Sequence, residues 1–271
     1  MKKNNSLLLS GPYILWMVAF TLIPLGVVLY YALTDVETGS FTLSNMAALI
    51  QYLPAFWRSI VYSLIAAAVC LLIGYPVAYY MSQCGATAQK FLYMLVMLPM
   101  CMSFLLRTLA WVGLLQDTGI INGILTKVGL NPIHVIGTET AVIIGMVYDY
   151  FPYMVLPIYS ILAKLDVKLL EAARDLGCGT VSVLRRVVFP LSMPGVVSGI
   201  TMVLIPSIST FYISQKLGNG KFFLIGDAIE GQYVANNLHF AAAIAFILML
   251  ILLVGMAIVK YVAAKYVYGG E

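Results

Sequence analysis

Charged residues are scarce in this chain, and their scarcity excludes most classes of soluble protein. Only 10% of the 271 residues are Asp, Glu, Lys or Arg, whereas 62% are hydrophobic. A soluble globular domain has about 25% charged residues and about half apolar residues. The formal net charge of +4 is too small to indicate a nucleic-acid partner. The composition therefore predicts an integral membrane protein that contacts lipid and binds no nucleic acid.

Residues that hold metals and nucleotides are also scarce. The chain has only two His and four Cys, and the cysteines show neither metal-ligand spacing nor a disulfide pattern. No phosphate-binding loop of the form Gly-x-x-x-x-Gly-Lys-Ser/Thr occurs, and Phe222 stands where the nearest stretch, 218–222, needs a hydroxyl residue. No paired-carboxylate, His-rich or nucleophile motif has adequate spacing. We expect no metal site, no cofactor and no catalytic centre on this chain.

Long apolar runs are present instead. Several are about 20 residues long, enough to cross a hydrocarbon core of ~30 Å. The first run follows Lys2 and Lys3 as a signal peptide would, but it is too long and lacks a prompt cleavage site, which favours a retained span. The sequence predicts an all-α membrane protein, with residues 1–271 forming a single domain. The six predicted spans are residues 11–33, 58–81, 91–115, 139–162, 192–214 and 239–262.

The basic residues predict the orientation of the spans. With the N-terminus inside, ten of the fifteen Lys and Arg fall in cytoplasmic segments, as the positive-inside rule requires. Both termini are then cytoplasmic, and residues 163–190 form the largest cytoplasmic loop. The ten are Lys2, Lys3, Lys90, Lys164, Lys168, Arg174, Arg185, Arg186, Lys260 and Lys265.

Prolines are frequent within the predicted spans. Each removes a backbone donor and frees a carbonyl one turn earlier, which lipid cannot satisfy. The pattern slightly favours a transporter or channel over ordinary packing irregularity. The prolines are Pro24, Pro76, Pro99, Pro152, Pro157, Pro194 and Pro206.

The cytoplasmic loop contains a short amphipathic helix over residues 166–177. Asp166 is a suitable N-cap, and Gly177 is a suitable helix stop. Leu169, Ala173 and Leu176 fall at helical spacing and are expected to share a face, which Leu170 and Ala172 widen. Thr180 is expected to cap a second helix that Pro190 ends at the entry to the fifth span.

Two interpretations of this helix are open. It could lie on lipid headgroups. However, the small side chains at 172 and 173 give a weak membrane face, and acidic residues at 171 and 175 would be repelled by anionic lipid. A rigid helix–glycine–helix segment instead suits docking into a groove of another protein.

The segment "EAARDLGCGTVSVLRRVVFP" (171–190) resembles the EAA loop of permease subunits in ATP-driven, binding-protein-dependent importers. It departs from that pattern only by Val187 for Ile and Phe189 for Leu. The resemblance implies a type I importer permease fold in which this loop is a coupling helix. The coupling residues it implies are Glu171, Ala172, Ala173, Arg174, Asp175, Leu176 and Gly177.

The same resemblance implies several partners. These are a dimer of ATPase subunits that binds ATP and Mg, a second related permease, and an external or periplasmic substrate-binding protein. The location it implies is the bacterial inner membrane.

Three further stretches are similar to spermidine/putrescine permeases, and to their B-type subunit more than to the C-type. They are "LPMCMSFLLRTLAW" (98–111), "YDYFPYMVLPIYS" (148–160) and "PSISTFYISQKLGNGKFFLIGDAI" (206–229). The substrate this implies is a polyamine. Related permeases for ferric iron, phosphonates or thiamine share the EAA loop, and an ion-gradient-driven transporter is the alternative outside this family.

Asp149 is the carboxylate best placed to meet a polycation within a predicted span. An intramembrane charge costs roughly 2.5–3.5 kcal/mol, so it normally faces a partner or the bundle interior. Arg107 is the obvious ion-pair partner, with a structural or gating role, and substrate contact is the other interpretation. Aromatic faces attract ammonium groups, and the candidates for such a lining are Tyr148, Tyr150, Trp111 and Tyr212.

The remaining polar candidates lie in predicted loops. Asp227 and Glu230 are expected in an outer loop, where surface charge is favoured over a role in receiving substrate or docking the binding protein. His134 and His239 are expected to be ordinary loop or span-end residues without a metal.

Overall fold

The computed structural model describes residues 11–35 and 39–268, and this part of the chain is almost entirely helical. Lys2 and Lys3, which contribute to the predicted orientation, lie outside the described residues. Six described helices are long and apolar enough to cross a membrane. The pairing between Thr34 and Phe41 is an isolated antiparallel bridge.

The chain divides into two compact units. The first combines Met1–Pro54 with Ala228–Ile251, and the second combines Ala55–Asp227 with Leu252–Glu271. The prediction of a single domain over 1–271 stays a prediction.

The first unit contains an apolar N-terminal helix, Gly11–Ala32, whose last part is α2 (Ile23–Ala32). It also contains α3 (Ser44–Ala47), most of α13 (Ile225–Val234) and the beginning of α14 (Leu238–Tyr268). The Tyr31 and His239 rings pack edge-to-face at 4.9 Å, so His239 lies in an aromatic contact. No side chain from position 11 to position 31 is buried within this unit, so the helix has an apolar surface that is unsuited to water.

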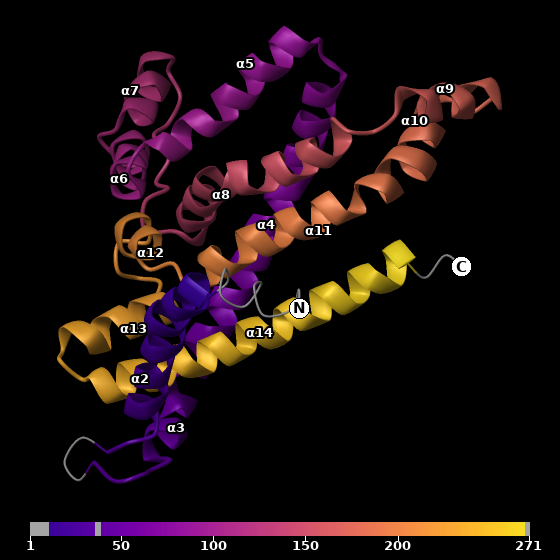
Figure 1. Cartoon of the computed structure of the whole chain (residues 1–271). Coiled ribbons are helices and arrows are strands. Elements are labelled where there is room, and N and C mark those ends of the chain that lie inside the picture. Colours follow the sequence, from indigo (N-terminus) through magenta and orange to yellow (C-terminus); the bar gives the residue numbers. More distant parts are fainter. Residues whose placement is uncertain (1–10, 36–38, 269–271) are drawn as a thin grey trace, which may run out of the picture. The chain divides into compact units, whose positions relative to one another are not determined.

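The second unit is built around α8 (Glu139–Leu162), the most buried of the candidate spans. It also holds most of α4 (Leu53–Gln83), and α11 (Phe189–Ile208) runs beside α8 (Figure 1). The smaller helices of this unit are α5 (Ala86–Met97), α6 (Phe104–Leu115), α7 (Ile120–Lys127), α9 (Val167–Asp175), α10 (Thr180–Val183) and α12 (Tyr212–Leu217).

Two glycines one turn apart bring α11 against α8. A Cβ atom at Gly195 would lie 2.9 Å from the Pro157 carbonyl oxygen, and one at Gly199 would lie 2.9 Å from the Met154 sulfur. Small residues at this spacing let two helix backbones approach closely, and such approach is the main source of packing energy between helices in lipid. The sequence therefore specifies a tight α8–α11 pair.

The predicted third span, 91–115, is not one helix. The helix α5 ends at Met97, a 3₁₀ turn covers Leu98–Cys101, and the backbone is extended at Met102 before α6 begins at Phe104. Pro99 has no N–H and its ring crowds the preceding turn, which explains the interruption. The stretch long enough to span in this region is Phe104–Lys127, which joins α6 to α7.

The fifth predicted span is shifted towards the N-terminus. A continuous helix runs from Thr180 to Ile208, where the sequence predicted 192–214, and α12 is a separate helix. The prediction that Pro190 ends a helix is wrong. The π-helical segment Leu184–Val188 widens the turn before this proline, which relieves the ring clash. Another π segment, Val18–Leu22, precedes Pro24 in the same way.

Thr180 is not the predicted N-cap either. Gly179 occupies that position, and Thr180 is the first helical residue. The fourth span agrees with the prediction at both ends, and α14 continues past the predicted sixth span to Tyr268.

Candidate coupling surface and intramembrane charge site

The cytoplasmic-loop helix predicted from the sequence is α9. The Asp166 carboxylate accepts a hydrogen bond from the backbone N–H of Lys168 at 3.0 Å. This bond satisfies one of the donors that the first turn of a helix leaves unpaired. Asp166 is therefore the N-cap, as predicted.

The other end of α9 closes in a Schellman motif. The Cys178 N–H donates to the Ala173 carbonyl at 3.1 Å, and the Gly177 N–H donates to the Arg174 carbonyl at 2.9 Å. Gly177 has φ +81°, a conformation that an L side chain adopts only at a cost. The predicted helix stop at Gly177 is confirmed, and the hydrogen bonds fix the direction in which the chain enters α10.

Only part of the predicted apolar face of α9 packs on the rest of the second unit. Leu170 is buried and Ala173 is half-buried against the core of this unit, so these two predicted members anchor the helix. Leu169 and Leu176 are 50% and 86% exposed and Ala172 is exposed too, so their assignment to this face is wrong. Leu176 is the C-cap and lies beyond the last regular turn, where helical spacing no longer applies.

The outer face of α9 and the turn that follows it carry most of the predicted coupling residues. The exposed ones are Glu171, Ala172, Arg174, Asp175, Leu176 and Gly177. Val181, two residues after Gly179, is also 77% exposed. The exposed apolar side chains of Leu176 and Val181 therefore accompany charged groups of both signs on this surface. An exposed surface of this kind on a rigid two-helix segment is suited to docking another protein.

A buried ion pair lies between α6 and α8. An Nη atom of Arg107 is 3.3 Å from an Oδ atom of Asp149, and the side chains are 7% and 1% exposed. The two atoms are not aligned for a hydrogen bond, so their attraction is that of two opposite charges at short range. Thr108 donates a hydrogen bond to the other Asp149 oxygen at 3.4 Å. The predicted pairing of Arg107 with Asp149 is confirmed.

Thr108 is a member of this site that the sequence reasoning missed. It directly follows Arg107, and both lie in the first turns of α6, just after the break at Met102. The available signal was its place directly after Arg107 in the stretch 98–111, which the sequence analysis found similar to spermidine/putrescine permeases. The break in the predicted third span therefore positions both groups that contact Asp149.

The four aromatic candidates do not form one lining around Asp149. The Trp111 and Tyr148 rings pack edge-to-face at 5.3 Å and border a cavity of about 630 Å³. The cavity is otherwise lined by Pro99 of the 3₁₀ turn and by apolar side chains of α4, α5 and α8, including Ile73 and Phe151. Trp111 and Tyr148 are thus brought together as a candidate aromatic surface.

Tyr150 and Tyr212 have other contacts. The Tyr150 hydroxyl donates to the Pro206 carbonyl at 3.2 Å, near the end of α11. Tyr212 packs on Phe104 at 6.3 Å, and the Lys216 ammonium lies 5.6 Å from the Tyr212 ring centre. Tyr150 therefore holds the end of a helix, and an exposed lysine of the same chain already lies near Tyr212.

The Asp227 side chain is buried, and the expectation of an outer-loop surface charge is wrong. Its carboxylate accepts hydrogen bonds from the Ser214 hydroxyl and from the Leu224 N–H, each at 2.8 Å. Leu224 directly precedes α13, so Asp227, in the first turn of that helix, acts as a helix-capping acceptor. Sequence reasoning missed Ser214, because nothing in the local pattern links it to Asp227.

His134 is an exposed loop residue, as expected, and its ring nitrogen lies 2.7 Å from a carboxylate oxygen of Asp117. Among the described residues, no group of three or more His, Cys, Asp or Glu side chains could hold a metal ion.

Comparison with known proteins places this architecture in a family. Residues 6–268 match the family described as binding-protein-dependent transport system inner membrane component. The chain is 38% identical over 240 residues to a Haemophilus influenzae spermidine/putrescine transport system permease protein PotB, covering 85% of this chain and 84% of that one. It is 33% identical over 256 residues to the Escherichia coli K12 protein of the same name, covering 91% and 92%.

The fold has a counterpart among solved structures. A chain of a bacterial alginate ABC transporter, solved in complex with an alginate-bound periplasmic protein, superposes with a TM-score of 0.77 at 17% identity. The superposition covers 98% of this chain and 96% of the other. At this identity the likeness concerns the fold alone, which is that of an ABC importer permease. The chain belongs to the family of inner-membrane components of binding-protein-dependent transport systems.

Proposed function

We propose that this chain is the transmembrane permease subunit of an ATP-driven polyamine importer. The observation that carries the proposal is the 33–38% identity to spermidine/putrescine permeases across most of both chains. Membership of an inner-membrane family and six apolar helices make it a multi-pass bacterial inner membrane protein. Both termini are proposed to face the cytoplasm.

The partners follow from the exposed surface of α9 and α10 and from what the chain lacks. Without a phosphate-binding loop, the chain depends on a separate dimeric ATPase that binds ATP and Mg. The groups that would contact that ATPase are the exposed residues of 171–177 and Val181. A second related permease would complete the membrane unit, and an external binding protein would deliver the substrate.

One helix connects the surface proposed to contact the ATPase, the exposed residues of 171–177 and Val181, to the buried Arg107–Asp149 pair. Thr180–Ile208 is continuous, so it extends roughly 43 Å at 1.5 Å per residue. Near its far end, the Pro206 carbonyl receives the Tyr150 hydroxyl, and Tyr150 is the neighbour of Asp149 in α8. Closure of the ATPase would displace α9. The continuous helix Thr180–Ile208 would then carry this displacement to the surroundings of the Arg107–Asp149 pair.

The cavity beside Trp111 and Tyr148 is the proposed contact for the substrate. Its volume of about 630 Å³ lies within the range of small-molecule pockets. Aromatic faces attract ammonium groups, and the apolar walls suit the methylene segments of a polyamine. Asp149 offers the negative charge that a polycation needs, but only if its pair with Arg107 opens. Arg107 would then act as a gate, because its charge repels the substrate while the pair is closed.

Reconstitution tests the proposal. The complex of this chain with a second permease, the ATPase and a binding protein, placed in liposomes, should take up labelled spermidine or putrescine only when ATP is present. Competition with ferric iron, a phosphonate or thiamine tests whether the complex carries one of these substrates of related permeases instead of a polyamine. Uptake of one of these, but not of a polyamine, would retain the permease role and reject the substrate.

An ion-gradient-driven transporter is the second candidate, favoured by the buried ion pair and the interrupted helices. This chain reconstituted alone should show no uptake on an imposed ion gradient. Uptake under that condition would reject the dependence on an ATPase.

A further inference from the structure

A groove along α5 has no role in the mechanism above. It has a volume of about 690 Å³ and lies over α5, the following 3₁₀ turn and Tyr159 of α8. It is distinct from the cavity at Trp111, because the two share no lining residue. The lining residues are Ala86, Gln89, Lys90, Tyr93, Met94, Met97, Leu98, Cys101 and Tyr159.

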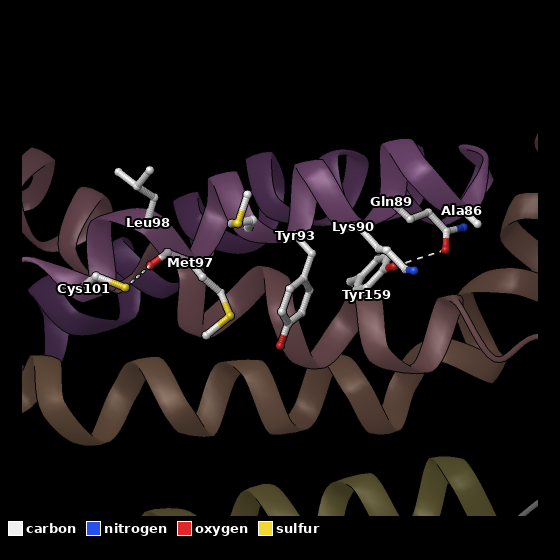
Figure 2. A pocket seen from close by; sticks show the side chains of 9 residues that line it. Ala86, Gln89, Lys90, Tyr93, Met97, Leu98, Cys101 and Tyr159 are labelled. Atoms are coloured by element: carbon white, nitrogen blue, oxygen red, sulfur yellow. Dashed lines mark hydrogen bonds between the residues drawn. The ribbon is translucent and has the colours of Figure 1, made fainter.

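The groove is polar at one end and apolar at the other, as Figure 2 shows. Gln89, Lys90 and Tyr159 lie at the end nearest Ala86, whereas Met97, Leu98 and Cys101 lie at the opposite end. A ligand that fits this arrangement has a polar head and a long apolar tail.

The polar end is held in a fixed geometry. The Gln89 side-chain nitrogen donates to the carbonyls of Ser82 and Cys84 at 3.1 and 2.9 Å, which ties α5 to the end of α4. The Tyr159 hydroxyl donates to the Gln89 side-chain oxygen at 3.4 Å. A pre-formed site loses little conformational entropy when a ligand binds.

Lys90 supplies an uncompensated positive charge at this end. Its side chain is exposed, and it has no ion-pair partner among the described residues. The charge repels a polyamine, so the groove is unsuited to the proposed substrate. It attracts an anionic head instead.

The length of the groove matches one leaflet of a bilayer. From Lys90 to Cys101 the chain advances roughly 18 Å along the helical axis, and half of a hydrocarbon core is about 15 Å. Met94 and Leu98 beside this path are 63% and 56% exposed, and therefore available to an acyl chain.

We propose that this groove binds an anionic phospholipid, with the phosphate at Lys90 and an acyl chain along Met94, Met97 and Cys101. In the proposed orientation, Lys90 lies on the cytoplasmic side, so the lipid belongs to the inner leaflet. Only that assignment of leaflet depends on the proposed function.

A tryptophan reporter tests the site. The full chain carrying Tyr93→Trp is placed in phosphatidylcholine nanodiscs containing a minor fraction of a brominated-chain lipid, either phosphatidylglycerol or phosphatidylcholine. Bromine quenches a nearby indole, and the chain without Tyr93→Trp corrects for the natural tryptophans. One exposed lysine contributes about 1 kcal/mol towards an anionic surface, so quenching by phosphatidylglycerol should occur at roughly fivefold lower lipid fraction.

The matched control compares two lysines. Lys90→Gln should abolish the preference, whereas Lys164→Gln, an exposed cation outside the groove, should leave it intact. Equal quenching by the two lipids in the Tyr93→Trp chain would overturn the proposal. Loss of all quenching in the complex with the second permease would also overturn it, because protein would then cover the groove.

A measurement with Tyr93 intact guards against a misfolded reporter. Native mass spectrometry of the purified chain should show retained phosphatidylglycerol, lost in Lys90→Gln and kept in Lys164→Gln. Equal retention in both variants would contradict the assignment. Neither measurement requires transport, so failure of polyamine uptake leaves the lipid result standing.

Discussion

At the scale of single residues, the feature that most needs a physical reason is the charge pair inside the membrane unit. Burying an Arg and an Asp costs several kcal/mol per ion, and the attraction between them offsets only part of this. Arg107 and Asp149 are 3.3 Å apart without an aligned hydrogen bond, so the contact is weaker than the best geometry allows. A pair that is costly to bury and imperfectly aligned is suited to opening during a conformational cycle.

Neutralising one member of this pair should cost more stability than neutralising both. Asp149→Asn leaves the Arg107 charge buried without a partner, and such losses are typically about 3–5 kcal/mol. The double variant with Arg107→Gln removes both charges and should recover most of the melting temperature of the purified complex. Uptake by the stable double variant should remain impaired if the carboxylate contacts substrate.

Two outcomes would contradict this account. A complex with Asp149→Asn that melts at the parent temperature would show that the pair contributes little. Full uptake by the double variant would leave the pair with a structural role alone.

Trp111 is expected to act on the substrate through its ring. Trp111→Ala should raise KM for polyamine uptake roughly fivefold, because a cation–π contact at a partly exposed ring contributes about 1 kcal/mol. Trp57 is 69% exposed and does not line the cavity, so Trp57→Ala controls for loss of an indole in the same unit. Equal effects of the two substitutions on KM would remove the aromatic contact from the mechanism.

At the scale of elements, the direction in which the chain leaves α9, the helix proposed to contact an ATPase, depends on backbone geometry at Gly177. The Schellman motif at Gly177 turns the chain from α9 into the long helix that begins at Thr180. The π segment before Pro190 then keeps that helix continuous through a residue that ordinarily interrupts one. Both features place a rigid connection between the exposed face of α9 and the centre of the second unit.

Gly177→Val should uncouple ATP turnover from substrate without preventing insertion. The left-handed conformation at this position costs an L side chain roughly 1–2 kcal/mol, so the end of α9 should fray. The readout is the stimulation of ATPase activity by loaded binding protein, measured beside the amount of chain in the membrane.

Gly179→Val is the matched control. Neither glycine has an atom within 4 Å of a built Cβ, but Gly179 has φ −67°, which any residue adopts. The two variants therefore differ mainly in backbone strain. If Gly177→Val kept normal stimulation, the motif at the end of α9 would have no part in coupling.

At the scale of the whole molecule, exposed apolar surface determines where the chain resides. The N-terminal helix is apolar along its length, and none of its side chains between positions 11 and 31 is buried within the first unit. Such a surface is stable in an apolar environment and not in water. The distribution of Lys and Arg then determines which side of the membrane each loop faces.

Labelling of introduced cysteines should report that orientation. In a chain whose natural cysteines are replaced by serine, Lys127→Cys should react with a membrane-impermeant maleimide on intact spheroplasts. Lys168→Cys should react only after permeabilisation. Both positions are exposed, so the contrast measures the side of the membrane. Reaction of Lys168→Cys on intact spheroplasts would reverse the proposed topology.

Much of this architecture could be predicted from local pattern. The fourth span, the N-cap at Asp166 and the stop at Gly177 depend on hydropathy and capping chemistry, and all three are confirmed. The break after Met97 and the continuity through Pro190 were not predicted. A proline can either interrupt a helix or be accommodated by a wider turn, and packing decides between the two.

The sequence by itself determined a helical membrane protein and its family, because apolar length and capping chemistry act locally. It indicated Arg107 as a partner of Asp149, because a charge inside a span has few possible partners, and the structure decided between that pair and the alternative of a free carboxylate. Tertiary structure decided that Trp111 meets Tyr148 whereas Tyr150 turns to the Pro206 carbonyl, and that Asp227 is buried against Ser214. The reason is geometric. Consecutive side chains on a helix point about 100° apart, so residues that are close in sequence need not belong to one site. The packing of helices against one another decides which face of each helix lines a site.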